Sequence, residues 1–174
     1  MSYIEHLESL KSLECSPAIG VESIDDLPPN LVGLHLRRVS GIRDCGRVEG
    51  LKRLEMLSIE GADELDDFDV VLSRDSLRSL NLSRNENLRC LDALPTESRI
   101  RELLIAGTSI SDLSPLTRLK WLRRLDISGC RLTDYDLLND LPSGMTLIVD
   151  QEIAASLPGS VRKKMRLFVR AHVR

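Results

Sequence analysis

The side chains that most often perform chemistry are few in this chain of 174 residues, and they do not cluster along the sequence. The three histidines are His6, His35 and His172, and none stands at a recognised catalytic spacing from a cysteine, a serine or a carboxylate. The sequence contains no glycine-rich phosphate loop and no HExxH metal motif. We therefore expect a protein that is not an enzyme and that needs no cofactor.

The cysteines and the densest group of carboxylates also have structural interpretations. Cys15, Cys45, Cys90 and Cys130 lie 30, 45 and 40 residues apart and form no CxxC pair, which excludes a zinc ribbon or a thioredoxin-type motif. We expect free thiols in a reducing compartment, with Cys90 partly exposed. The acidic run over residues 63–69 lacks the central glycine and the final glutamate of an EF-hand, so we interpret it as a solvated edge.

The composition points to one kind of packing repeated many times. Leucine occurs 32 times, whereas aromatic residues make up 3% of the chain. No apolar run approaches the roughly 18 residues of a membrane span. The first residues lack the basic start and apolar stretch of a secretion signal. The charged fraction of 29% and a mean hydropathy of -0.11 are those of a folded domain. Because the sequence shows neither a membrane span nor a secretion signal, we expect the protein in the cytoplasm.

A short pattern, L-x-x-L-x-L, explains most of the leucines. Its copies begin at residues 31, 54, 77, 100, 122 and 144, at spacings of 23, 23, 23, 22 and 22. The fourth and sixth positions alternate as in a short strand with one buried face. Further apolar residues three apart, such as Leu113, Leu116 and Leu119, suit a helical or 3-10 turn on the opposite side. A single unit cannot bury its apolar stripe, but stacked units can. The sequence therefore predicts an α/β solenoid over residues 31–150, with a parallel concave sheet and short convex helical segments.

These units carry the leucine-rich repeat signature, and the best copies are 100–110 and 122–132. The 22-residue period and the run 110–116 resemble internalin-type repeats and the leucine-rich regulatory subunit of protein phosphatase 1. The segments 27–31 and 141–147 resemble type III secreted effectors of Gram-negative bacteria. The resemblance implies a non-enzymatic module that binds a protein partner, as a bacterial effector delivered into a host cell. The family's ladder position holds Asn85, Thr108 and Cys130, with Val39 and Ala62 earlier, which implies a partial asparagine ladder.

An alternative function also follows from the effector resemblance. Some of those effectors carry a ubiquitin ligase domain with a C-x-D motif, and Cys90-Leu91-Asp92 matches it by letters. This match falls inside a repeat, and the helical catalytic domain is missing, so we treat it as coincidence. The alternative is that the chain is the substrate-recognition domain of a larger enzyme of this kind.

Both ends of a solenoid must be covered. We expect residues 1–30 to form an N-terminal cap and an irregular first repeat, with a short covering helix as one option for residues 2–13. Residues 151–174 should form a basic C-terminal capping helix, because Val161, Met165 and Phe168 share a helical face. The segment 159–174 has six basic and no acidic residues, so binding of nucleic acid or an anionic membrane is a second interpretation of it. We expect a monomer.

Function should lie on the concave strand face, where side chains are not needed for the repeat. Met56, Leu104 and Ile148 are apolar there without a structural reason, which is typical of binding anchors, although each is also compatible with an ordinary surface residue. Glu102, Arg124 and Asp126 alternatively form an internal ladder of ion pairs. The candidate partner-binding residues are His35, Arg37, Met56, Glu60, Asn81, Glu102, Leu104, Arg124, Asp126 and Ile148.

Overall fold

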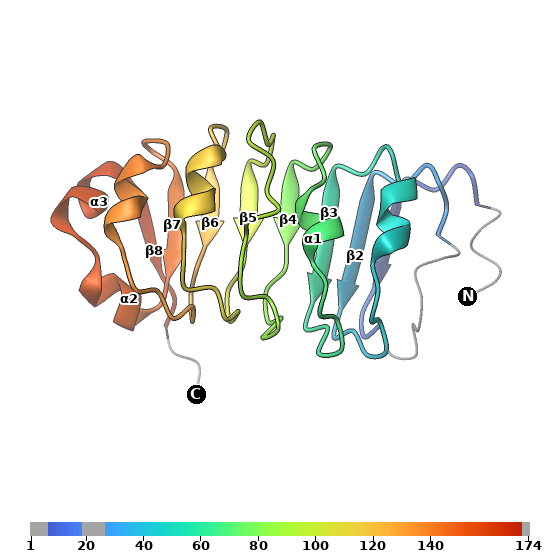
Figure 1. Cartoon of the computed structure of the whole chain (residues 1–174), viewed down its shortest axis with the longest axis horizontal. Coiled ribbons are helices and arrows are strands. Elements are labelled where there is room, and N and C mark those ends of the chain that lie inside the picture. Colours follow the sequence, from blue (N-terminus) through green and yellow to red (C-terminus); the bar gives the residue numbers. More distant parts are fainter. Residues whose placement is uncertain (1–6, 19–26, 172–174) are drawn as a thin grey trace.

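The computed structural model of the chain describes residues 7–18 and 27–171. It contains one eight-stranded parallel sheet in which every strand pairs with the next strand in chain order, as Figure 1 shows. The strands run from the upper to the lower edge of the molecule in this view. They are β1 (Ser12–Cys15), β2 (Gly33–Arg37), β3 (Met56–Glu60), β4 (Ser79–Asn81), β5 (Glu102–Leu104), β6 (Arg124–Asp126), β7 (Thr146–Val149) and β8 (Arg166–Val169).

The leucine pattern sets the register of the sheet. The fourth position of each repeat pairs with the same position in the next repeat, as Leu34 with Leu57 and Leu80 with Leu103 do. These four leucines are buried to 2% exposure or less. Because side chains alternate between the two faces of a strand, the residues between the leucines face the other side. The predicted solenoid and its parallel sheet are therefore confirmed.

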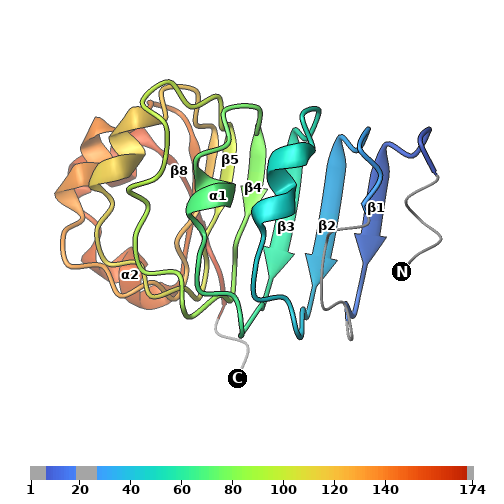
Figure 2. The same ribbon diagram turned by 45° about the vertical axis from the view of Figure 1, so that its right-hand side comes forward.

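Short helical segments cover one face of the sheet, and the core lies between them and the strands (Figures 1 and 2). In four of these segments an aspartate two residues before the first helical residue accepts a hydrogen bond from that residue's backbone N–H, which favours the turn. These hydrogen bonds include the one from Ser114 that lowers the pKa of Asp112. The segments are η1 (Gly46–Gly50), α1 (Asp69–Leu72), η2 (Ser114–Arg118), η3 (Asp136–Asp140), α2 (Gln151–Ser156) and α3 (Gly159–Lys164).

The inward polar position after each strand carries the partial ladder. Asn85 is fully buried, and its side-chain amide donates to the carbonyls of Ile59 and Leu82 at 2.7 and 2.8 Å. Its Oδ1 accepts from the backbone N–H of Ala62 at 2.8 Å. In the next repeat Thr108 Oγ1 donates to a single carbonyl, that of Ile105, at 2.8 Å. Asn85 thus ties together backbone from two repeats where the other positions make fewer bonds.

The C-terminal end differs from the prediction in part. Two short helices, α2 and α3, follow the last full repeat, and Ile153 and Val161 pack into the core. The predicted helix does not continue, however, because Arg166–Val169 form β8, which pairs with β7. Phe168 therefore lies opposite Ile148 in a sheet rather than on a helical face with Val161. The expectation of one capping helix through this segment is wrong.

At the N-terminal end, the structure tests part of the segment for which a covering helix was one option, residues 2–13. Residues 8–9 form a turn, and β1 then pairs in parallel with β2. Residues 7–13 thus hold no helix, and the rest of the segment proposed as a covering helix, residues 2–6, lies outside the described residues. No helix in the described part of the chain is long and apolar enough to cross a membrane.

Candidate functional site

The face of the sheet opposite the helices is open, and its side chains come from the third, fifth and seventh positions of each repeat. The strand register places these side chains in rows across neighbouring repeats, so residues far apart in sequence become neighbours. This open face is the predicted concave face. It is hollowed where the strands end, along the lower edge in Figure 1.

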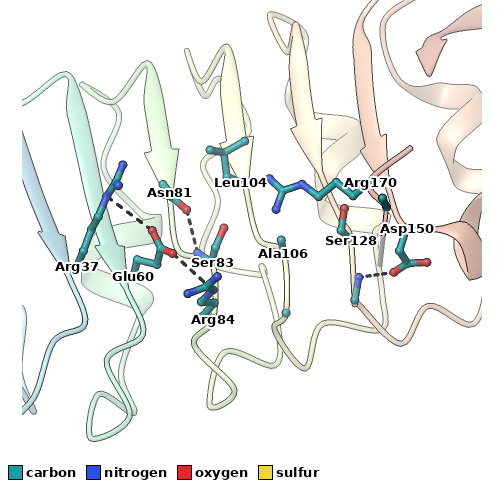
Figure 3. Close-up of a pocket in the computed structure, with 13 residues that line it drawn as sticks. Arg37, Glu60, Asn81, Ser83, Arg84, Leu104, Ala106, Ser128, Asp150 and Arg170 are labelled. Atoms are coloured by element: carbon teal, nitrogen blue, oxygen red, sulfur yellow. Dashed lines mark hydrogen bonds and ion pairs between the residues drawn. The ribbon is translucent and has the colours of Figure 1, made fainter. Parts of the chain in front are cut away.

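The hollow, which we call the strand-end groove, has a volume of about 440 Å³ and crosses the sheet from β2 to β8. Figure 3 shows Arg37 and Arg84 towards one end of the groove and the Arg170 side chain reaching from the other end towards Leu104. The lining residues are Arg37, Glu60, Asn81, Ser83, Arg84, Leu104, Ala106, Gly107, Ser128, Gly129, Asp150, Arg170 and Ala171.

One end of the strand-end groove is a charged triad. The carboxylate of Glu60 lies between two guanidinium groups, 3.9 Å from Arg37 Nε and 3.6 Å from Arg84 Nε. Both arginine side chains are more than half exposed, so the pairs add little to stability. The same carboxylate and Arg84 also border a second hollow of about 770 Å³ below the edge of the sheet. The guanidinium groups therefore retain donors for a ligand.

Arg84 has an unusual backbone conformation. Its φ is 63°, and that of Arg38, one position after β2, is 51°. The corresponding positions Gly61, Gly107 and Gly129 are also left-handed, with φ between 65° and 74°. Glycine adopts this conformation freely, whereas an L residue with a side chain loses about 1–2 kcal/mol. Arginine thus occupies two positions of this column at a cost in stability that the three glycines avoid.

The other end of the strand-end groove is held by the C-terminal segment. Arg170 Nη2 lies 2.5 Å from the buried carboxylate of Asp126, and its side chain points across the sheet towards Leu104 in Figure 3. Asp150 caps α2 by accepting from the N–H of Ile153 at 2.9 Å. Between them, the Ser128 hydroxyl is buried and has no hydrogen-bond partner among the described residues.

Comparison with solved structures identifies the architecture. An internalin (inlF) from Listeria monocytogenes superposes on 98% of this chain with a TM-score of 0.72 and 18% sequence identity. The chain folds as a leucine-rich repeat solenoid. An internalin C2 (inlC2) from the same organism matches 96% of the leucine-rich repeat chain and 74% of its own, with a TM-score of 0.56 and 17% identity. The solenoid described here spans 59% of the length of the first of these structures. No protein-family model and no curated protein sequence matches the chain.

The leucine-rich repeat fold brings some of the predicted residues together. Arg37, Glu60, Asn81 and Leu104 line the strand-end groove. Met56, 40% exposed, lies higher on the open face, where its methyl group is near Gly33.

Other predicted residues lie outside the strand-end groove. His35 is half-buried on the same face as Met56. Glu102 and Arg124 form an ion pair at 3.1 Å, and Glu102 also accepts from Ser79 Oγ at 2.8 Å. The ladder alternative therefore describes Glu102 and Arg124, whereas Asp126 pairs with Arg170 instead.

Two of the predicted positions are not accessible. Ile148 is 3% exposed because β8 passes beside it as an additional strand, and the Asp126 side chain is 1% exposed where Arg170 reaches it. The expectation that Ile148 is an exposed apolar anchor is wrong. Phe168, its neighbour in β8, is 59% exposed and takes the outer place in this row.

Sequence reasoning missed the three other charged residues of the groove, Arg84, Asp150 and Arg170, for identifiable reasons. Arg84 stands three residues beyond the end of β4, and its signal was an arginine at a repeat position that three other repeats fill with glycine, at 61, 107 and 129. Asp150 could have been recognised as a helix N-cap, because an aspartate precedes α2. Arg170 lies in a segment assigned to a helix, so nothing in the local sequence placed it near Asp126.

The cysteines support no metal or redox site in the described part of the chain, residues 7–18 and 27–171. No group of three or more His, Cys, Asp or Glu side chains there could hold a metal ion, and the four cysteines are free. Burial, with Asp44 and Asp67 nearby, raises the pKa of the Cys45 thiol to about 12. Burial likewise raises the pKa of Cys130, whereas Cys90 is exposed.

These environments predict selective alkylation. The thiolate is the reactive form, and at pH 8 about one Cys45 side chain in ten thousand is ionised at a pKa of about 12. Iodoacetamide at pH 8 should label Cys90 first and leave Cys45 and Cys130 unlabelled, as measured by peptide mass spectrometry. In denaturant all four should react at similar rates. Labelling of Cys45 in the folded protein as fast as Cys90 would contradict its burial.

Proposed function

We propose that this leucine-rich repeat chain is a protein-interaction module that binds a partner protein through the open face of its sheet. The strand-end groove is the centre of the binding surface, and its arginines and Leu104 make the main contacts. Arginine is enriched among residues that dominate binding energies, and an apolar residue between charged groups supplies an anchor. Of the residues predicted from the sequence, Arg37, Glu60, Asn81 and Leu104 belong to this proposal, with His35 and Met56 at its margin.

The observation that carries the proposal is the left-handed backbone at Arg84. A residue that costs stability is retained when its side chain has a function, so the strained backbone at Arg84 indicates that its guanidinium is used. Among the described residues, the Arg84 side chain forms one ion pair, with Glu60 at 3.6 Å, and it is 73% exposed. Neither contact nor burial explains an arginine in place of glycine. Binding of an external group by the guanidinium does.

The variant Arg84→Gly separates stability from binding. Glycine removes the left-handed strain but gains freedom in the unfolded chain, so we expect the free energy of unfolding to stay the same or to rise by up to about 1 kcal/mol. Binding of the partner should fall at least about tenfold if the guanidinium is a main contact. The partner is first captured with the intact chain and identified by mass spectrometry. Its affinity for each variant is then measured by calorimetry, and stability is measured by urea denaturation.

Matched variants decide whether the groove is the binding site. Leu104→Asp should also weaken binding, because it places a carboxylate in the apolar middle of the groove. Arg131→Glu, an exposed arginine outside the groove, should leave binding unchanged. A partner that binds Arg84→Gly and Leu104→Asp as tightly as the intact chain would overturn the proposal. An effector role, cytoplasmic location and monomeric state stay predictions from the sequence.

A further inference from the structure

The edge of the sheet where the strands begin, the upper edge in Figure 1, carries a second set of arginines. Arg78, Arg101 and Arg123 occupy the same position in three successive repeats. Their backbones bond in sequence, with Arg101 N–H donating to the Arg78 carbonyl and Arg123 N–H to that of Arg101, both at 2.7 Å. Neighbouring strands are about 4.8 Å apart, so three guanidinium side chains leave the molecule from adjacent strands. Such a row concentrates positive charge at this edge, which favours binding of an anion.

An exposed tryptophan stands within these arginines. Trp121, the single tryptophan of the chain, is 60% exposed, although large aromatic side chains are normally mostly covered. It occupies the repeat position that Arg99 holds one repeat earlier. Together with Arg78, Arg99 and Arg101 it lines a hollow of about 320 Å³. We call Arg78, Arg99, Arg101, Trp121 and Arg123 the basic edge.

The cations of the basic edge are largely unpaired within the described residues. Arg78 forms an ion pair with Glu55 at 3.1 Å. The side chains of Arg99, Arg101 and Arg123 make no ion pair or hydrogen bond with any residue in 7–18 or 27–171. The opposite edge, where the strands end, is mixed in charge, because carboxylates accompany the arginines of the strand-end groove. Exposed carboxylates there include Asp63, Glu64, Asp66, Asp67 and Glu86.

Trp121 also borders another hollow of the basic edge, of about 570 Å³, on its other side. This hollow combines cations with apolar side chains, since Arg123 and Arg166 line it together with Pro142 and Met145. A ligand that fits both hollows therefore carries negative groups and at least one apolar group close together. Side chains of a polypeptide can enter such hollows, whereas the flat surface of a bilayer leaves them unfilled. Single-stranded nucleic acid normally stacks on several aromatic residues, and aromatic residues are 3% of this chain.

We propose that the basic edge is a second interaction surface, which binds an acidic segment of a protein with an apolar side chain seated against Trp121. Arginine is suited to bidentate binding of carboxylates, and Trp and Arg are the residue types most enriched among binding hot spots. The surface is distinct from the strand-end groove, because the two lie at opposite ends of the strands. One chain can therefore contact two partners, or two parts of one partner.

The test selects peptides without presuming their sequence. A display library of random 12-residue peptides is selected against the full chain, and the fluorescence of Trp121 is recorded as each selected peptide is titrated. We expect Asp- and Glu-rich peptides with an apolar residue that change the Trp121 emission and bind more weakly as salt rises. The double variant Arg99→Glu/Arg101→Glu should lower their affinity at least about tenfold. Leu104→Asp and Arg131→Glu should leave it unchanged.

Other ligands serve as competing outcomes. Vesicles of phosphatidylcholine and phosphatidylserine, and a 20-residue oligothymidylate, are titrated against the same emission. The proposal is overturned if either of them shifts Trp121 at a lower concentration than the peptides do, which would assign the edge to a membrane or to nucleic acid. It is equally overturned if the selected peptides are not acidic or bind the double variant unchanged. A peptide that binds the intact chain and fails only on Leu104→Asp would belong to the strand-end groove instead.

Discussion

Replacing Asn85 by alanine is expected to lower the free energy of unfolding by about 4 kcal/mol, because one side chain satisfies three buried backbone groups. The substitution leaves the N–H of Ala62 and the carbonyls of Ile59 and Leu82 without their partner. Each buried group left unpaired costs about 1–3 kcal/mol, and the smaller side chain adds a cavity. Urea denaturation followed by circular dichroism measures the loss.

The comparison that isolates this effect uses a second asparagine. Asn139 donates its amide to the carbonyl of Asp136 within one exposed turn, so Asn139→Ala should cost less than about 1 kcal/mol. Since each repeat contacts mainly its neighbours, the damage from Asn85→Ala should centre on the repeats of β3 and β4. Hydrogen exchange should therefore quicken there before it does in β6 and β7. Equal losses of unfolding free energy from the two alanine variants would show that the buried hydrogen bonds of Asn85 stabilise the fold no more than an exposed one does.

The repeating part of the fold could be predicted because its constraints are local and redundant. Each leucine slot is defined by neighbours within six residues, and every copy reports the same register, so Leu34, Leu57, Leu80 and Leu103 were placed correctly. The partial ladder followed for the same reason, since Asn85 and Thr108 hold fixed offsets from their strands. Repetition thus compensates for the weakness of any single short pattern.

The C-terminal strand was missed because its signal is displaced. Leu167 and Val169 occupy the fourth and sixth positions of one more copy, as their pairing with Leu147 and Val149 shows. That copy begins at Lys164, 20 residues after Gly144 rather than 22, and a lysine replaces its first leucine. The local spacing of Val161, Met165 and Phe168 suits a helix equally well. Pairing with the free edge of β7 decides the outcome, and that contact is invisible to periodicity within the segment.

The candidate site was predictable only where the repeat itself exposes a side chain. Strand alternation located Arg37, Glu60, Asn81 and Leu104 on the open face. It said nothing of Arg84, which the turn after β4 brings into the groove, or of contacts between distant segments. The exposed position of Trp121 was not predicted for a related reason, because residues just before a strand belong neither to the core nor to the open face.

Replacing Arg170 by methionine is expected to lower the free energy of unfolding, because this arginine pairs with a buried carboxylate. Its guanidinium lies 2.5 Å from the Asp126 carboxylate, whose side chain is 1% exposed, and removing it leaves a buried charge without its partner. Because the arginine itself is 51% exposed and water offsets part of the loss, we expect about 2 kcal/mol rather than the full penalty of a buried pair. Urea denaturation provides the measurement, with Arg166→Met, at the start of β8, as the control.

A double-mutant cycle shows whether the pair itself is responsible. If the loss comes from the unpaired carboxylate, then Asp126→Asn added to Arg170→Met should recover part of the stability, because the amide removes the charge and keeps an acceptor for the Ser128 N–H. Strictly additive losses would instead assign the effect to packing of the arginine stem. The outcome also bears on Ile148, which stays covered only while β8 remains paired. Loosening of β8 should therefore expose Ile148, two strands from Leu104 in the same row, and make an inaccessible apolar residue part of the open face.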